Sequence, residues 1–476
     1  MPAEKLDSTL HNHLVSRGRR SAGDSSPLRP DELGPVQEDA LHRVERYLKF
    51  LKGLGDPELR QAIDKHQTTI LKGVQSGIAE STRSATRGGE PPRKTRGMDL
   101  AKAALGERPS FLVINNEICL DSSLADPAGW QILLDRPEVR KALRPRLAGV
   151  GLIIDEGTTA LGTGFLVAPN LVMTNRHLAE RMFDLDSAES PPPLLAGKGR
   201  WYVIFSHEFT TAGPGPLVEG KVRGLRFVSP QRIIEPDFTH PETFSDSDVA
   251  LLEIDPPHAA QLPLIELYQG NPSFSPELVV VVGHPFFDSR YKQQFDSVAK
   301  DQRIAFDSVF GKQFEFKHAA PGYASAFSIP QTMRRASIDS HLGLTTNLVH
   351  DVSTLGGNSG SPVLALEGQC PAIGIHFWGQ AATAPNQYAN LAHPFSSLDN
   401  VPNHSGLKRW GNIFQEVLGA PGLSSSRRLA NTQQDESQVS SPRGGNGSPR
   451  LNSAVAARKP RRIRKKTAKR SSKIRL

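Results

Sequence analysis

Hydrophobic residues first fall into a regular pattern near residue 36, where two helical stripes follow one another. Within each stripe the apolar positions return to one face of a helix, and the segment GLGD separates the two. Asp56 in this break is a favourable N-cap, and Pro57 suits the first helical position. The stripes are Leu41, Val44, Leu48 and Leu51, then Leu59, Ile63, Ile70, Val74 and Ile78. The pattern predicts a helical hairpin over residues 36–80.

The segments around this hairpin have no periodic apolar face. Residues 1–35 and 423–476 are rich in Ser, Gly, Pro and Arg, which is typical of disordered termini. Residues 81–107 contain Gly-Gly, Pro-Pro and several basic residues, which predicts a flexible linker.

Residues 108–422 show a different pattern, in which short apolar runs alternate with loops rich in Gly, Pro, Asn and Asp. Examples are GFLVA, LVMT, WYVIF, VALLEI and LVVVVG. Many short strands at such spacing predict a mainly β domain, an antiparallel sandwich or barrel rather than a βαβ sheet. Helices are expected only near residues 135–147 and 407–418.

Composition and cysteine spacing argue against several classes of protein. The chain has 476 residues, and none of its apolar runs reaches the roughly 18 residues of a membrane span. The N-terminal segment does not resemble a secretory signal, so the expected location is the cytoplasm. Cys119 and Cys370 are too far apart in sequence for a disulfide framework, a zinc motif or a redox pair, which predicts free thiols.

Positive charge is concentrated at the C-terminal end. The net charge is +8, and residues 458–476 alone hold 11 Lys and Arg and no acid, so the rest of the chain sums to −3. Such a segment could bind nucleic acid with a steep salt dependence, or acidic membranes or proteins. A solvated end without a partner is the simpler alternative.

Two candidate proton-transfer groups stand where apolar runs meet loops. His177 follows the run LVMT, and Asp248 directly precedes VALLEI. Asp246 competes with Asp248, but Asp248 is adjacent to the strand and therefore held more rigidly. Each residue alone also has an ordinary interpretation, since histidine is common in cores and on surfaces and aspartate is common in loops.

The stretch TLGGNSGSPVL contains a candidate nucleophile, Ser359. Glycine-rich turns are frequent, so the stretch alone would be moderate evidence. However, Gly357 has no Cβ, and its N–H could turn toward a substrate carbonyl beside the N–H of Ser359. The two donors would form an oxyanion hole.

The combination GTGF…LVMTNRH, DVALLEI and GGNSGSPV…IGIHFWG resembles the bacterial branch of the chymotrypsin-like serine proteases, and among them the glutamyl endopeptidases. The resemblance covers roughly residues 150–415. It implies a double six-stranded β-barrel with the site between the barrels, no cofactor or metal, and a polypeptide substrate. It further implies that His177 is the general base, Asp248 its orienting acid and Ser359 the nucleophile, with Gly357 and Ser359 N–H groups as the oxyanion hole.

One residue departs from the pattern of the family. Chymotrypsin-like enzymes that are activated by cleavage carry an Asp just before the serine, which pairs with a newly freed N-terminus. Asn358 occupies that position here and cannot form the ion pair. The sequence therefore predicts an enzyme that needs no such activation.

The resemblance also bears on specificity. Ser353 stands where a trypsin-like enzyme would carry an Asp, which argues against basic substrates. Thr354 and His376 match the pocket of glutamyl endopeptidases, which predicts Glu or Asp before the cleaved bond. Phe377, Trp378 and Gly379 would line the cleft, although His376 and Trp378 would equally suit a barrel core.

A function from another class stays open at this stage. The protease fold could be catalytically idle, with the hairpin and the basic tail binding partners. No substitution in the three motifs favours that alternative.

Overall fold

The computed structural model describes residues 30–86 and 110–413, apart from gaps within the second stretch. The longer gaps are 122–128, 210–216, 231–245, 256–261, 286–300, 310–315, 329–344, 380–389 and 404–409. The expected disordered termini lie outside the described residues, except for residues 30–35, which are helical rather than disordered. The linker after residue 86, the basic segment 458–476 and most of the helix expected near 407–418 also lie outside the described residues. Nucleic-acid binding by the basic segment stays a prediction.

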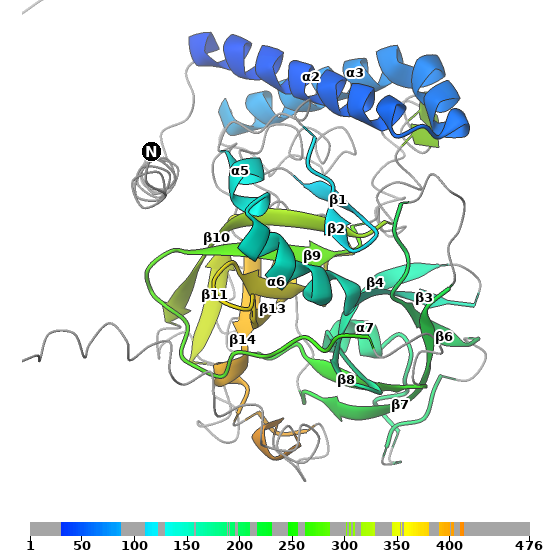
Figure 1. Ribbon diagram of the computed structural model, residues 1–476, viewed down its shortest axis with the longest axis vertical. Coiled ribbons are helices and arrows are strands. Elements are labelled where there is room, and N and C mark those ends of the chain that lie inside the picture. The colour runs from blue at the N-terminus through cyan, green and yellow to red at the C-terminus, as the bar shows by residue number, and fades with distance from the viewer. Residues whose placement is uncertain are drawn as a thin grey trace, which may run out of the picture. The chain divides into compact units, whose positions relative to one another are not determined.

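Helices α2 (Pro30–Gly53) and α3 (Pro57–Thr86) form the predicted hairpin (Figure 1). The Oδ1 atom of Asp56 accepts hydrogen bonds from the N–H groups of Glu58 at 2.9 Å and Leu59 at 3.0 Å, as an N-cap does. Most of the predicted apolar positions are buried, with Leu48, Leu51, Ile63 and Ile70 fully covered. Leu41 is partly buried, and the side chain of Ile78 lies outside the described residues. Helix α3 continues past the expected boundary at residue 80, because residues 81–86 contain no glycine or proline.

Six strands after the hairpin close into a first antiparallel barrel, in the order β3-β4-β5-β8-β7-β6. Its interior holds a separate apolar cluster that includes Ile153, Leu166 and Leu252. The strands are β3 (Val150–Asp155), β4 (Ala160–Ala168), β5 (Leu171–Thr174), β6 (Trp201–Ile204), β7 (Glu219–Val228) and β8 (Ala250–Ile254).

Six later strands form a second ring, in the order β11-β14-β13-β12-β9-β10, and the pairing of β10 with β11 closes it. Strands β1 (Phe111–Ile114) and β2 (Glu117–Ile118) extend this sheet from β10. The six are β9 (Glu277–Gly283), β10 (His318–Ser328), β11 (Thr346–His350), β12 (Pro362–Ala365), β13 (Ala372–Gly379) and β14 (Asn390–Pro394). The predicted chymotrypsin-like double barrel is thereby confirmed.

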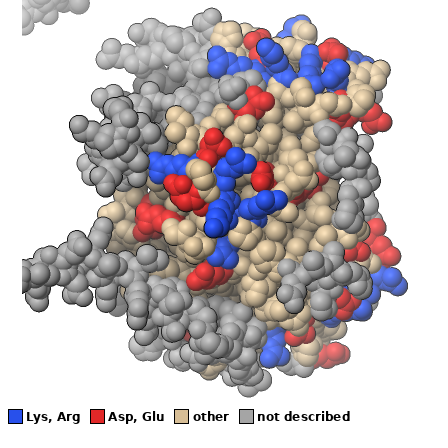
Figure 2. Space-filling model, viewed as in Figure 1, with Lys and Arg blue, Asp and Glu red and all other residues tan. Residues whose placement is uncertain are grey.

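Short helices accompany the barrels, and among the described residues they include α5 (Trp130–Leu134), α6 (Pro137–Ala148), α7 (Arg176–Ala179) and η6 (Phe395–Ser397). Helix α6 is the one expected near residues 135–147. The face in Figure 2 carries neighbouring basic and acidic side chains, and on α6 the guanidinium of Arg140 pairs with Glu117 and Asp135.

None of the described helices combines the length and the apolar character that crossing a membrane requires. Both cysteines are free thiols, as predicted.

A buried lysine connects the two barrels. Lys317, just before β10, has no exposed surface, and its Nζ donates to three oxygens at 2.9 Å each. The acceptors are the carbonyls of Leu147 at the end of α6 and Phe205 after β6, and the carboxylate of Glu208. Glu208 also accepts the N–H of Asn116 in the β1–β2 turn, at 2.8 Å. This contact of Lys317 was not predicted from the sequence.

Candidate active site

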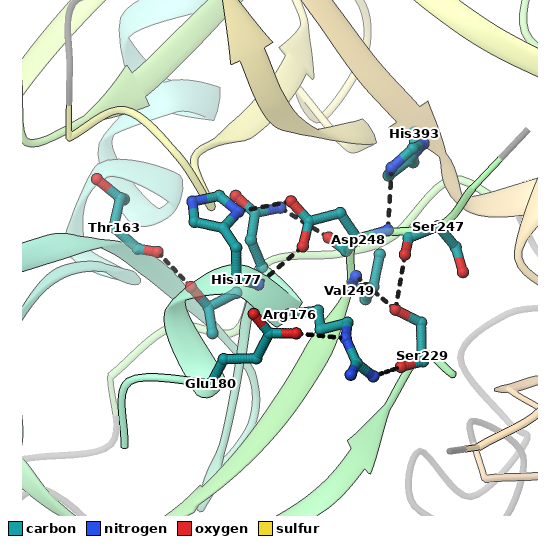
Figure 3. Close-up of polar contacts among 11 residues, drawn as sticks. Thr163, Arg176, His177, Glu180, Ser229, Ser247, Asp248, Val249 and His393 are labelled. Carbon is teal, nitrogen blue, oxygen red and sulfur yellow. Dashed lines mark hydrogen bonds and ion pairs between the residues drawn. The ribbon is translucent and has the colours of Figure 1, made fainter. Parts of the chain in front are cut away.

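His177 is held by its neighbours on α7, the short helix after β5. The sequence suggested a strand end, but the chain turns into a helix one residue before His177. On one side the Asn175 side chain donates to the carbonyl of Asp248 at 2.8 Å. On the other, Arg176 donates to the carbonyl of Ser229 and pairs with Glu180 at 2.8 Å (Figure 3). The backbone that carries the imidazole is thereby tied to the strands that flank Asp248.

Asp248 meets His177 through both of its carboxylate oxygens. Oδ2 lies 2.6 Å from Nδ1 of the imidazole, and Oδ1 accepts the His177 backbone N–H at 2.9 Å. Burial would raise the pKa of this carboxyl, but the charge and hydrogen bonds of His177 lower it below its usual value. An ionised Asp248 keeps the proton of the neutral imidazole on Nδ1 and leaves Nε2 free to act as a base.

The loop that carries Asp248 is braced by one hydroxyl. Ser229 Oγ donates to the carbonyl of Ser247 at 2.8 Å and accepts the N–H of Val249 at 3.2 Å (Figure 3). Asp246 is equally buried, so burial would not separate the two candidate acids. The hydrogen bonds do separate them, because His177 pairs with Asp248.

His393 on β14 is a site residue that the sequence analysis missed. Its Nε2 accepts the backbone N–H of Asp248 at 3.1 Å, and its Nδ1 lies 3.0 Å from Oδ1 of Asn347 (Figure 3). Burial lowers the pKa of His393 to about 3, against the opposing charge of Asp248. The ring is therefore neutral near pH 7, with its proton on Nδ1 and donated to Asn347. Nothing local in the segment NLAHPF marks this histidine, which lies 145 residues from its partner in sequence.

Ser359 lies half-buried in a turn between β11 and β12. Gly357 and Gly360 on either side have φ values of 88° and 86°, in the left-handed region that favours glycine. A Cβ on Gly360 would also collide with the carbonyl of Thr163. The turn is closed by a hydrogen bond from the Ser361 N–H to the carbonyl of Asn358, at 2.9 Å. The glycines around the serine are thus required by the backbone geometry.

Gly162 on β4 shows that the serine turn and the histidine helix approach the same point. A Cβ on Gly162 would contact the carbonyl of Ser359 on one side and the side chain of Leu178, the residue after His177, on the other. Strand β13 joins the same region, because the carbonyl of His376 accepts the Gly360 N–H at 2.9 Å. The fold therefore gathers the three predicted segments at the junction of the barrels.

His376 is buried on β13 and pairs with a second histidine, His350 on β11. Its Nδ1 lies 3.1 Å from Nε2 of His350, whose own Nδ1 is buried without a hydrogen bond among the described residues. Burial and the charge of His177 lower the pKa of His376 to about 3, although a backbone hydrogen bond with Leu391 acts in the opposite direction. Burial likewise keeps the pKa of His350 well below its usual value. Both rings are therefore neutral near pH 7.

The remaining predicted pocket residues occupy different surroundings. The hydroxyl of Thr354 donates to Oδ1 of Asn390 at 2.9 Å, and the exposed Gly379 lies against this pair. Phe377 departs from the expectation that it lines the cleft. It is 6% exposed and stacks on the ring of His393, with 3.8 Å between centroids. Like the preceding residues of β13 it is buried, and it supports the ring that holds Asp248.

Of the other predicted pocket residues, one is described and one is not. Trp378 is half-buried and packs against the main apolar cluster, and Ser353 lies outside the described residues. Within the described part of the chain, His, Cys, Asp and Glu form no group of three or more that could hold a metal ion.

Three comparisons show which known proteins this chain is similar to. The search of curated proteins finds no match to the chain. Among solved structures, the HtrA-type protease AlgW with a decapeptide is similar at 15% identity, with 54% of this chain and 63% of that chain covered and a TM-score of 0.32. The Rv3671c protease of M. tuberculosis H37Rv, in an inactive form, is similar at 17% identity, with 61% and 94% covered and a TM-score of 0.32. This chain thus spans less than two thirds of the length of the AlgW chain. In sequence, residues 162–375 match the family model of the trypsin-like peptidase domain.

Proposed function

We propose that this protein is a serine endopeptidase that cleaves peptide bonds through an acyl-enzyme. The observation that carries the proposal is the double contact between His177 and the buried Asp248, at 2.6 Å and 2.9 Å, beside the glycine-bounded turn of Ser359. The contact with Nδ1 places the carboxylate on the ring, and the contact with the backbone N–H holds the residue that carries the ring. Both contacts together fix the position and the tautomer of the ring.

The proposed mechanism follows from these groups. Nε2 of His177 takes the proton of the Ser359 hydroxyl as its Oγ attacks the substrate carbonyl. Asp248 stabilises the imidazolium, and the N–H groups of Gly357 and Ser359 bind the oxyanion. His177 then gives its proton to the leaving amine, and a water activated by the same ring hydrolyses the acyl-enzyme.

A fluorophosphonate probe tests the proposal, because it labels only a serine with an activated hydroxyl. We expect the full-length protein to be labelled at Ser359, and the Ser359→Ala and His177→Ala variants to stay unlabelled. Ser361→Ala serves as the matched control, since it removes a neighbouring serine of the same turn. A folded wild-type protein that takes up no label would favour the alternative, a protease fold used only for binding.

We further propose a preference for Glu or Asp before the cleaved bond. The support is the position of His376 on the strand that contacts the serine turn, and of Thr354 beside Gly379 at the end of that strand. His376, neutral near pH 7, has one N–H, and it would give this N–H to the carboxylate in place of the backbone of Leu391, in a hydrogen bond that the substrate's own charge strengthens.

A peptide library tests this preference. We expect the wild type to favour Glu at the position before the cleaved bond, and His376→Ala to lose that preference while it still cleaves other peptides. His66→Ala, in helix α3, is the control and should change nothing. An unchanged cleavage pattern in His376→Ala would remove His376 from the pocket.

A further inference from the structure

Thr163 on β4 is the residue of the first barrel that binds the serine turn of the second. It is fully buried. Its N–H donates to the carbonyl of Ser359 at 2.9 Å, and its hydroxyl donates to the carbonyl of Gly357 at 2.8 Å. The same hydroxyl accepts the N–H of His284 at 2.9 Å, and the Thr163 carbonyl accepts the hydroxyl of Thr174 at 2.7 Å (Figure 3). Every polar atom of Thr163 thus has a partner.

These contacts flank the proposed oxyanion donors. The carbonyl of Gly357 belongs to the peptide before Asn358, and the carbonyl of Ser359 to the peptide before Gly360. Each peptide unit is planar, so a carbonyl held by a hydrogen bond fixes the plane of its whole peptide. The peptide between the two fixed ones carries the N–H of Ser359 and is therefore restrained from both ends. The Gly357 N–H is on the same residue as one fixed carbonyl. The Ser359 N–H is therefore oriented from the first barrel, and the residue that carries the Gly357 N–H is anchored to it as well.

The hydroxyl has only one proton, and its surroundings decide where that proton points. Because the His284 N–H occupies a lone pair of the oxygen, the proton is left for the Gly357 carbonyl. A side chain of the same shape without the hydroxyl would leave a buried N–H and a buried carbonyl unpaired. Gly357, at a φ of 88°, has no side chain of its own to resist rotation.

We propose that Thr163 is a positioning residue that holds the oxyanion-hole turn in its working conformation, in place of the ion pair that Asn358 cannot form. The inference rests on the proposed protease function and identifies Thr163 as the residue that would keep its site ordered. It explains how a chain without the acidic residue of cleavage-activated enzymes keeps the serine turn ordered.

Steady-state kinetics of Thr163→Val and Thr163→Ser test the inference. Valine keeps the shape and the backbone N–H but removes the hydroxyl. Loss of a single oxyanion donor lowers kcat by about 10²–10³-fold, so a misplaced donor should cost roughly 10–100-fold in kcat. We expect little change in KM, weaker binding of a peptide boronate by a similar factor, and a rate for Thr163→Ser within about threefold of wild type.

Thr174→Val is the matched control, because it removes a buried hydroxyl from the same network without touching Gly357. It should keep the wild-type kcat after correction for folded protein. Rates are expressed per active site, titrated on monomer isolated by gel filtration, so that partial unfolding does not count as lost catalysis. If Thr163→Val yields no folded protein, Thr163→Cys replaces it, and its weakly donating thiol should give an intermediate kcat.

The outcomes separate the two proposals. A wild type that neither hydrolyses peptides nor takes up fluorophosphonate overturns the protease function itself. An active wild type with equal kcat in Thr163→Val, or in Thr163→Cys where that variant is used, overturns the role of Thr163. A loss in Thr163→Val that Thr163→Ser does not restore also overturns it, because the hydroxyl would then not be the cause.

Discussion

Replacing Asp248 with Asn should lower kcat about 10⁴-fold, the cost of this change in a Ser-His-Asp site. The amide keeps the shape of the carboxylate but can donate a hydrogen bond to Nδ1 of His177, which favours the tautomer with its proton on Nε2. That tautomer cannot accept the proton of Ser359. The effect should be large here because Oδ2 lies 2.6 Å from Nδ1 and Asp248 is 1% exposed, so water cannot replace the lost charge. The rate of hydrolysis of a peptide ester or amide measures it.

Asp255→Asn is the control for this change. Asp255 pairs with Arg223 at the surface, 39% exposed, so the same substitution should leave kcat unchanged. Far-ultraviolet circular dichroism should show both variants folded. A tenfold or smaller loss in Asp248→Asn would mean that the carboxylate does not orient the base, and Asp246 would then need the same test.

Replacing Lys317 with Ala should lower the free energy of unfolding by about 3–5 kcal/mol, the usual cost of breaking a buried ion pair. The change removes three hydrogen bonds and leaves the carboxylate of Glu208, 10% exposed, without its cation. Burial lowers the pKa of Lys317, but Glu208 opposes this shift and favours the charged amine. Urea unfolding, followed by tryptophan fluorescence, measures the loss.

Two further variants serve as comparisons for Lys317→Ala. Arg223→Ala breaks the exposed pair with Asp255 and should cause a much smaller change in the unfolding midpoint. A double change, Lys317→Met with Glu208→Gln, removes both charges and should recover most of the loss. A destabilisation by Lys317→Ala no larger than that by Arg223→Ala would show that the buried pair does not hold the barrels together.

The sequence was sufficient wherever the cause of a structure is local. Asp56 and Pro57 mark the start of α3, because a capping oxygen and a fixed φ act on their own turn. Short apolar runs separated by turn residues indicated a barrel of short strands. An apolar run marks the buried face of a strand, and the turn residues after it mark where the chain reverses direction. The three motifs around His177, Asp248 and Ser359 could be found for the same reason, since each is a short segment with its own chemistry.

Only the tertiary structure decided how those segments support one another. The contact between Asp248 and His393 joins residues 145 positions apart, and the one between Thr163 and Gly357 joins residues 194 apart. Phe377, which was expected to line the cleft, is buried and stacks on His393, because the packing of the barrel decides which neighbours surround a side chain of β13. A hydrogen bond between two barrels depends on how both have folded, and neither segment carries a local signal for its distant partner.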